Sequence, residues 1–363
     1  MGKYESLKDF DWLLLGLLIA ISALGVMQIY STTVHTKFAG AHLKQIYWLS
    51  IGFGLLFFLC LYDYHDLLNH MPFFYFLSLI LLVAVLAVGS DVSGARRWFR
   101  VGGFSFQASE PVKLVIILLL ARFFSDTPRE GVSLADTIKV FLAVAIPGAL
   151  IALQPDLGTA LTIVPIALVM LFMAGLRLRY FGLMFLALLL ALPLAVLHMK
   201  PYQRARLTTF LNPELDAKKS GYQLLQSKIA VGSGQLTGKG IAQGTQTQLW
   251  FLPVPHTDFI FAAFSEEHGF IGVIVGLLLY LVLLLRLLHN AQSAPDMAGM
   301  YITIGIATVF FFQILVNVGM VVGYVPVTGI PLPLMSYGGT SVLFTFMAMG
   351  LVNSIRVRRF VNG

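Results

Sequence analysis

The chain has 363 residues, of which 58% are hydrophobic and 11% are charged, and its formal net charge is +7 at pH 7. A soluble domain carries about 25% charged residues, so this composition excludes an ordinary soluble domain and predicts an integral membrane protein. The only cysteine, Cys60, excludes an internal disulfide and a metal site built on cysteine ligands.

Apolar runs long enough to cross about 30 Å of hydrocarbon recur along the whole chain. They predict an all-α integral membrane protein with about ten transmembrane helices, forming one polytopic domain over residues 1–363. The predicted spans are 12–31, 45–61, 72–89, 110–125, 138–153, 158–175, 180–198, 269–288, 300–323 and 340–355.

A polar segment, residues 199–264, separates the seventh predicted span from the eighth. Because the number of spans is even, both termini are expected on one side of the membrane. The short loops on that side are richer in Lys and Arg, which predicts cytoplasmic termini and a non-cytoplasmic long loop. Within the loop, apolar and polar residues interleave over 222–231 and predict an amphipathic helix.

Cations gather at the non-cytoplasmic face, against the usual charge bias. Arginine suits bidentate contact with phosphate, so Arg96 and Arg97, with Lys113, predict an anionic ligand there; contact with lipid headgroups is the alternative. Glu110 lies three residues before Lys113 and shares its helix face. The two form either a structural ion pair or, with Asp156, the lining of a polar cavity.

A glycine-rich stretch at 232–240 resembles a phosphate-binding loop only superficially. Ser233 and Gly240 stand where a Walker A loop needs Gly and then Ser or Thr, and Thr237 replaces the third glycine of the dinucleotide pattern. Nucleotide binding is therefore excluded, and no nucleic-acid partner is expected. The backbone amides of this stretch remain able to face an anion.

The long loop closes on His256, Thr257 and Asp258, just before hydrophobic sequence resumes. An acidic group at the mouth of a membrane-embedded body is costly to keep there, so it indicates a functional site. Asp258 is the first candidate for chemistry. The spacing of the nearby histidines does not suit zinc, whereas carboxylates beside a pyrophosphate would suit Mg²⁺ or Mn²⁺.

Taken together, these motifs resemble the SEDS family (shape, elongation, division and sporulation), and within it the elongation branch more than the division branch. The resemblance runs almost end to end, and the motifs occur in the right order. They are 11–12, 29–31, 94–99, 109–113, 154–159, 210–213, 226–234, 244–246, 256–262 and 326–341. One departure is Val254, where the family usually has Glu, so no role of that acid carries over.

The resemblance implies a peptidoglycan glycosyltransferase that polymerises lipid II during cell elongation, on the outer face of the bacterial cytoplasmic membrane. It also implies a divalent cation (Mg or Mn), a class B penicillin-binding protein as partner, and other membrane proteins of the elongation machinery. The chemistry suits the residues, because Asp258 as general base can take the proton of the acceptor's 4-hydroxyl while undecaprenyl pyrophosphate leaves. The predicted substrate-binding residues are Arg96, Arg97, Glu110, Lys113, Asp156, His256 and Thr257.

Two other functions would use similar features. A flippase for lipid-linked precursors needs the cations and a polar cavity but no base, and a scaffold for a cell-wall synthase needs neither. Alternating access usually rests on paired repeats, and the sequence shows no repeat with a fixed period.

Overall fold

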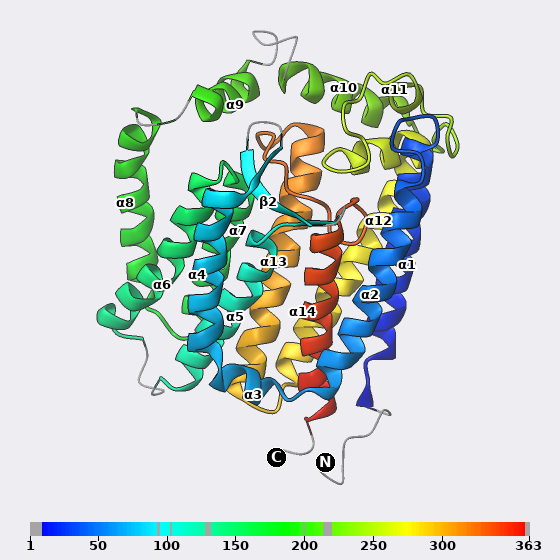
Figure 1. Cartoon of the computed structure of the whole chain (residues 1–363). Coiled ribbons are helices and arrows are strands. Elements are labelled where there is room, and N and C mark those ends of the chain that lie inside the picture. Colours follow the sequence, from blue (N-terminus) through cyan, green and yellow to red (C-terminus); the bar gives the residue numbers. More distant parts are fainter. Residues whose placement is uncertain are drawn as a thin grey trace.

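The computed structural model describes residues 9–92, 95–101, 104–127, 132–197, 199, 201–212 and 220–359. Within these ranges, ten long helices form the body of the molecule and coincide with the ten predicted spans (Figure 1). They are α1 (Trp12–Thr33), α2 (Ala41–Leu61), α4 (Met71–Val88), α5 (Ser109–Ser125), α6 (Leu134–Leu153), α7 (Leu157–Met173), α8 (Leu178–Leu197), α12 (Ile260–Gln292), α13 (Met297–Val322) and α14 (Gly339–Val357).

Seven of these helices are long and apolar enough to cross a membrane by length and composition, namely α1, α2, α4, α6, α12, α13 and α14. Helices α5 and α7 have 17 residues each, and the apolar part of α8 is also shorter. The predicted class, a helical membrane protein, is confirmed.

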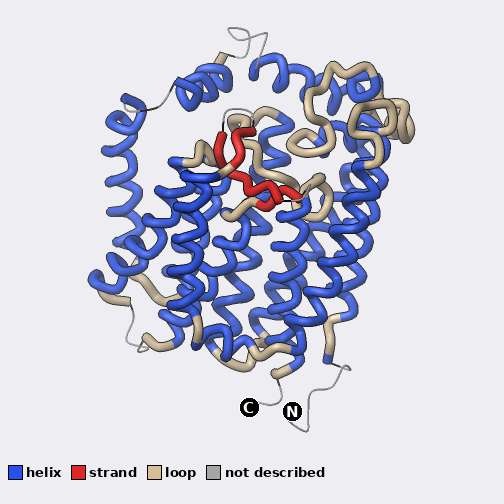
Figure 2. Tube along the Cα trace, in the orientation of Figure 1, coloured by secondary structure: helices blue, strands red, loops and turns tan. Residues whose placement is uncertain are grey.

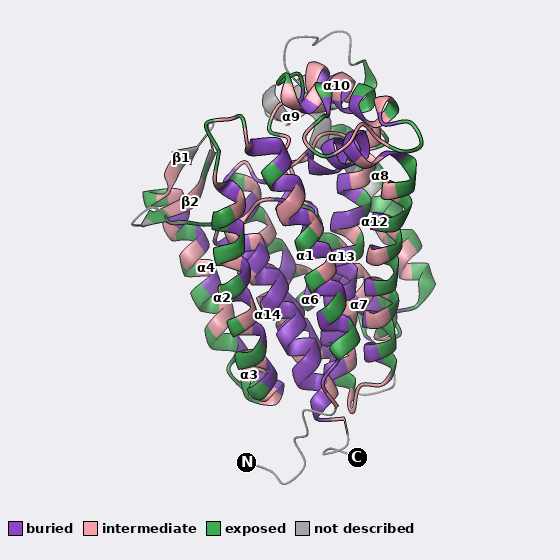
Figure 3. Cartoon of the chain, turned by 90° about the vertical axis from the view of Figure 1, so that its right-hand side faces the viewer, coloured by how far each residue is buried: buried purple, intermediate pink, exposed green. Residues whose placement is uncertain are grey.

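Helices α13 and α14 lie at the centre of the bundle. In their most apolar stretches 61% and 78% of the residues are buried, against 22% in α4. The outer helix α4 instead exposes large apolar side chains such as Phe73, Phe76 and Ile80, and Figure 3 shows the same contrast between buried and exposed faces. Exposed apolar side chains on an outer helix are suited to contact with lipid.

Helix α1 begins and α14 ends at the same end of the bundle (Figure 1), and we call the opposite end the distal end. At the start of α1, Asp11 accepts a hydrogen bond from the backbone N–H of Leu14 at 3.1 Å, which caps the helix. The same carboxylate accepts hydrogen bonds from Arg286 at 2.8 Å and Asn290 at 2.7 Å, both on α12. Arg356 on α14 lies 3.7 Å away. This cluster fixes three helices to one another.

A small antiparallel sheet, which the hydropathy pattern does not predict, lies at the distal end between α4 and α5 (Figure 2). Its strands are β1 (Ser90–Val92), β2 (Ala95–Val101) and β3 (Phe104–Phe106), in the order β1-β2-β3. Side chains alternate between the two faces of a strand, so Arg97 and Phe99 share one face of β2. Phe99 packs against the hydrophobic core, whereas Arg96 and Arg100 are exposed. The sheet thus turns Arg97 toward the bundle.

Four short helices complete the described chain, and three of them belong to the long segment between α8 and α12. They are α3 (Tyr64–Asn69), α9 (Pro201–Leu211), α10 (Ser220–Ser233) and α11 (Thr245–Gln248). Helix α10 covers the predicted amphipathic helix at 222–231. It packs against α12 and α13, and Ser227 donates a hydrogen bond to the carbonyl of Val321 at 2.8 Å. One face of α10, with the buried Leu224, Ser227 and Ala230, therefore lies against the bundle, whereas Ile229 is exposed.

Helix α12 begins at Ile260, inside the predicted loop, and bends at Gly269, where φ is +64°. The bend lets the loop dock on the helix backbone, because Phe270 and Ile271 donate to the carbonyls of Gln235 and Leu236 at 2.8 and 3.1 Å. A Cβ at Gly269 would lie 2.2 Å from the nitrogen of Gly238. Only glycine allows this approach.

The same docking involves two backbone amides of the glycine-rich stretch 232–240, which were candidates for binding an anion. Lys239 and Gly240 donate their backbone N–H groups to the carbonyls of Glu266 and Glu267, at 3.1 and 3.0 Å. These amides serve the fold, not a ligand.

The fully buried carboxylate of Glu266 anchors the next part of the loop. It accepts hydrogen bonds from the Lys239 ammonium at 2.7 Å, from the backbone of Gln246 at 2.9 Å, and from the backbone and hydroxyl of Thr247 at 3.2 and 2.9 Å. A buried charge requires such a complete set of partners. Polar residues at the start of α12 therefore hold the loop that leads to Asp258.

Candidate functional site

Asp258 lies in the turn directly before α12, at the distal end. Its backbone carbonyl accepts a hydrogen bond at 3.0 Å from the side-chain amide of Asn317 on α13, and the same amide donates to the carbonyl of Ile330 at 2.8 Å. Asn317 thus joins the turn to the segment 325–338. A Cβ at Gly329, where φ is +74°, would lie 3.4 Å from the Asp258 carboxylate, so this carboxylate lies directly against the segment.

The segment 325–338 also holds the two residues before Asp258. The backbone N–H of Tyr337 donates to the carbonyl of His256 at 2.9 Å, and the hydroxyl of Ser336 donates to the carbonyl of Thr257 at 2.7 Å. Three successive carbonyls, at 256, 257 and 258, therefore have partners from elsewhere in the chain. The turn is fixed before any ligand binds, as a catalytic group requires.

Charged side chains from three other elements surround Asp258. Burial raises the pKa of the Asp258 carboxyl above its usual range; the positive charges of Arg97 and Arg206 lower it, and the negative charge of Asp156 raises it. Arg206 belongs to α9 in the long segment and donates to the carbonyl of Thr328 at 3.4 Å. The structure thus brings together two acids and two guanidinium groups.

Asp156 caps the start of α7 and is nearly enclosed by donors. Its carboxylate accepts hydrogen bonds from Gln107 at 2.6 Å, from Ser109 at 3.2 Å and from the hydroxyl of Thr159 at 3.0 Å. One of its oxygens lies 3.8 Å from Arg97. With its oxygens occupied in this way, Asp156 is suited to orienting Arg97.

Glu110 and Lys113 form a buried ion pair with a nitrogen–oxygen distance of 3.0 Å. The Lys113 ammonium also lies 4.3 Å from the centroid of the Phe344 ring, and only 1% of the lysine side chain is exposed. Because this charge is satisfied inside the bundle, the geometry favours the structural ion pair of the two alternatives. A ligand at the distal end would reach Lys113 only if neighbouring side chains moved.

Arg96, although adjacent to Arg97, is exposed and projects from the opposite face of β2. No side-chain hydrogen bond or ion pair of Arg96 occurs within the described ranges. Its position suits contact with solvent or headgroups more than contact with Asp258.

The two other predicted residues, His256 and Thr257, precede Asp258 directly and add no charge to the site. His256 is buried against the rings of Phe38 and Tyr337, at centroid distances of 4.8 and 6.0 Å, and this burial lowers its pKa, so its imidazole is neutral near pH 7. Thr257 is partly exposed, and its hydroxyl donates to the carbonyl of Val254 at 3.4 Å.

Sequence reasoning missed three residues of this arrangement. Asn317 is an amide within an otherwise apolar span, and a polar residue at such a position is a usable signal of function. Arg206 lies in the long loop, where cations carry little weight for orientation. Gln107, which contacts Asp156, gave no signal because it precedes the helix in an irregular stretch.

The site offers few ligands for a metal ion. Among the described residues, no group of three or more His, Cys, Asp or Glu side chains is arranged to hold an ion. Mg²⁺ is commonly held by one or two carboxylates together with substrate phosphates. An ion here would therefore depend mainly on substrate oxygens, since the described residues offer no preformed site.

Known proteins resemble the chain over nearly its whole length. The FtsW/RodA/SpoVE family, described as cell cycle proteins, matches residues 9–360. The peptidoglycan glycosyltransferase MrdB of Escherichia coli is 41% identical over 79% of this chain and 78% of that protein. The peptidoglycan glycosyltransferase RodA of Treponema pallidum is 33% identical over 98% and 100%.

Solved structures of other proteins are also similar to this chain over nearly its whole length. The crystal structure of the rod shape determining protein RodA of Thermus thermophilus has a TM-score of 0.73 at 31% identity, covering 97% of this chain and 98% of that one. A chain from a peptidoglycan synthase complex, studied for the coordination of polymerization and crosslinking, has a TM-score of 0.84 at 34% identity over the same shares. The chain therefore belongs to the SEDS family, which includes RodA, FtsW and SpoVE.

Proposed function

We propose that this chain is a peptidoglycan glycosyltransferase that polymerises lipid II during cell elongation. The observation that carries the proposal is the fixed Asp258 carboxyl, with its raised pKa, beside Arg97 and Arg206. The names of the relatives MrdB and RodA support the activity. Relatives named FtsW also match, one of them at 34% identity over 98% of this chain, so the elongation role rests on the form of the segment 326–334.

In the proposed reaction the acceptor's 4-hydroxyl attacks the anomeric carbon of the donor sugar. Asp258 takes the hydroxyl proton, and burial suits it to this task because it brings the pKa closer to neutral pH. The bond from the sugar to the pyrophosphate oxygen breaks, and undecaprenyl pyrophosphate leaves. Arg97 stabilises the charge that develops on the leaving group. The Arg97 side chain is 33% exposed, so a leaving group at the distal end can reach it.

We place the distal end on the extracytoplasmic face of the cytoplasmic membrane and the termini in the cytoplasm. The excess of Lys and Arg in short loops on the side of the termini supports this orientation. Lipid II then enters sideways from the outer leaflet, with its pyrophosphate at the level of β2.

Further components follow from the same proposal. A class B penicillin-binding protein is the expected partner, as the similarity to a chain from a peptidoglycan synthase complex suggests, together with other elongation proteins. A divalent cation, Mg²⁺ or Mn²⁺, held mainly by the pyrophosphate oxygens of the substrate, would neutralise part of their charge.

The decisive experiment is polymerisation of fluorescent lipid II by the purified protein, with and without a class B penicillin-binding protein. We expect glycan strands from the wild type, and from Asp258→Ala bound lipid II but no polymer. A wild-type protein that moves lipid II between leaflets at the rate of that variant and makes no glycan would identify a flippase. A protein that does neither, yet stimulates its partner, would be a scaffold.

A further inference from the structure

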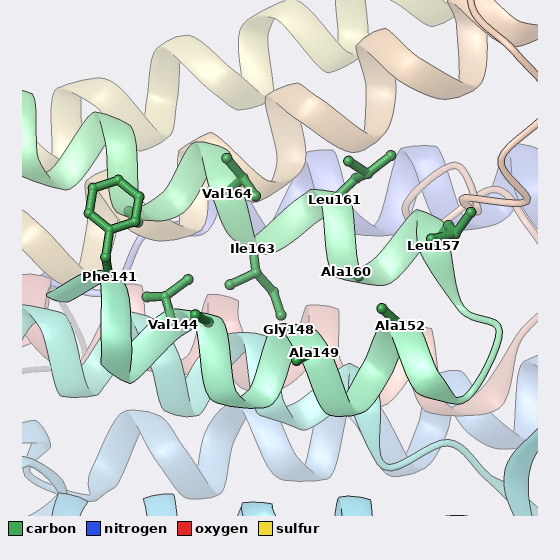
Figure 4. A pocket seen from close by; sticks show the side chains of 12 residues that line it. Phe141, Val144, Gly148, Ala149, Ala152, Leu157, Ala160, Leu161, Ile163 and Val164 are labelled. Atoms are coloured by element: carbon green, nitrogen blue, oxygen red, sulfur yellow. The ribbon is translucent and has the colours of Figure 1, made fainter. Parts of the chain in front are cut away.

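Helices α6 and α7 enclose an apolar groove of about 410 Å³ (Figure 4). Small side chains create the space, because they leave a gap where larger ones would pack. Those that line it include Ala145, Gly148, Ala149 and Ala152 on α6, and Ala160 on α7. A Cβ added at Gly148 would meet no atom within 4 Å, so the groove is open at this point.

The groove begins at the candidate functional site. Leu157 lines one end of it and Phe141 the other (Figure 4). Leu157 directly follows Asp156, whose carboxylate lies 3.8 Å from Arg97. A molecule bound through Arg97 therefore has the mouth of the groove beside it.

The length of the groove corresponds to one leaflet. Its lining on α7 extends from Leu157 to Ala167, and ten helical steps of about 1.5 Å give about 15 Å. This is about half of the roughly 30 Å hydrocarbon thickness. The groove therefore covers the leaflet on the side of the distal end.

The apolar lining of the groove also limits which chemical class of ligand can bind there. All its side chains are aliphatic apart from the phenyl ring of Phe141, so a sugar, a peptide or a phosphate would lose its hydrogen bonds to water there without replacement. A hydrocarbon chain has no hydrogen bonds to water to lose, and it gains van der Waals contacts with the lining. Only a lipid with an anionic head fits the groove and the guanidinium of Arg97 at the same time.

We propose that the groove between α6 and α7 binds the polyprenyl chain of the pyrophosphate-linked substrate, with the first isoprene units at Leu157. This inference rests on the proposed function, because it assigns the tail of the lipid whose head reacts at Asp258. The groove orients the lipid so that its pyrophosphate meets Arg97. The contacts of the tail with the groove contribute to substrate affinity and not to the chemical step.

The test fills the groove and varies the lipid. Gly148→Leu places a branched side chain in the open space, and the kinetics are measured with undecaprenyl lipid II and with an analogue that carries one isoprene unit. We expect KM for the undecaprenyl substrate to rise about tenfold, the size of effect typical of a changed apolar pocket, with kcat retained. The short analogue cannot reach Gly148 from Leu157, so its KM should not change.

Two further variants make the comparison specific. Gly16→Leu on α1 is the matched control, because a Cβ at Gly16 also meets no atom within 4 Å. Gly16 is exposed and lies far from the groove, so this variant should behave like the wild type. Ala149→Leu fills the same groove from a neighbouring position and should repeat the effect if Gly148→Leu does not fold.

A photoreactive undecaprenyl lipid II gives a readout that does not depend on turnover. It should label peptides of α6 and α7 in the wild type, and unlabelled lipid II should compete while phospholipid should not. Equal competition by phospholipid, or unchanged kinetics in both groove variants, would overturn the inference. If the wild type makes no glycan from either substrate, the proposed function fails, and labelling still reports whether the groove binds the chain.

Discussion

Asp258 lies where three distant parts of the chain meet: the turn before α12, strand β2 with Arg97, and helix α9 with Arg206. If Asp258 is the general base, Asp258→Asn keeps its size and removes its basicity. We expect glycan formation from lipid II to fall by about 10²–10⁴-fold with unchanged expression. Asp136→Asn, at an acid outside the site that pairs with Lys139, is the control. Near-normal synthesis by a folded Asp258→Asn protein would refute the assignment.

The charges around Asp258 also predict how activity depends on pH. The base works only when deprotonated, so kcat/KM should rise with pH through the raised pKa of Asp258. Arg97→Gln removes a positive charge that lowers this pKa, so the rise should move to higher pH. Arg96→Gln, on the opposite face of β2, should leave its position unchanged. A pH profile that is the same in both variants would show that Arg97 does not act on the base.

At the scale of elements, the bent helix α12 and the docked loop act as one unit that presents the Asp258 turn. Glu266→Gln removes the charge that holds Lys239 and weakens the hydrogen bonds to Gln246 and Thr247. Hydrogen bonds to a charged group contribute about 1.5–3 kcal/mol each, so we expect faster backbone hydrogen exchange over 234–248 and a lower Tm. Lys139→Met removes an exposed ion pair and should change neither. Unchanged exchange in Glu266→Gln would mean that backbone docking at Gly269 suffices.

For the whole molecule, the orientation in the membrane can be measured directly. Leu249 at the distal end is 62% exposed and Met297 at the other end is 43% exposed, while the native Cys60 is buried. On spheroplasts with an intact cytoplasmic membrane, a membrane-impermeant maleimide should label Leu249→Cys. It should label Met297→Cys only after the membrane is permeabilised. The reverse pattern would place the site in the cytoplasm.

The apolar runs predicted the ten long helices because a span must satisfy its backbone internally, whatever it packs against. The sheet was not predictable in this way, since β2 is only seven residues long and is rich in arginine. The same limit applied to the start of α12, because the predicted span begins at 269 although tertiary partners keep Glu266 and Glu267 in a helix that begins at Ile260. Sequence spacing paired Glu110 with Lys113, but it could not show that the pair is buried or that Arg206 lies near Asp258.

The Asp11 cluster has a consequence for biosynthesis. Arg286, which donates to Asp11, is made 275 residues later, and Arg356 follows later still. The first helix therefore enters the membrane with a charged cap that stays unpaired until almost the whole chain has emerged. An incomplete chain that stops before α12 cannot form the contacts through which Asp11 holds α1 to α12 and α14.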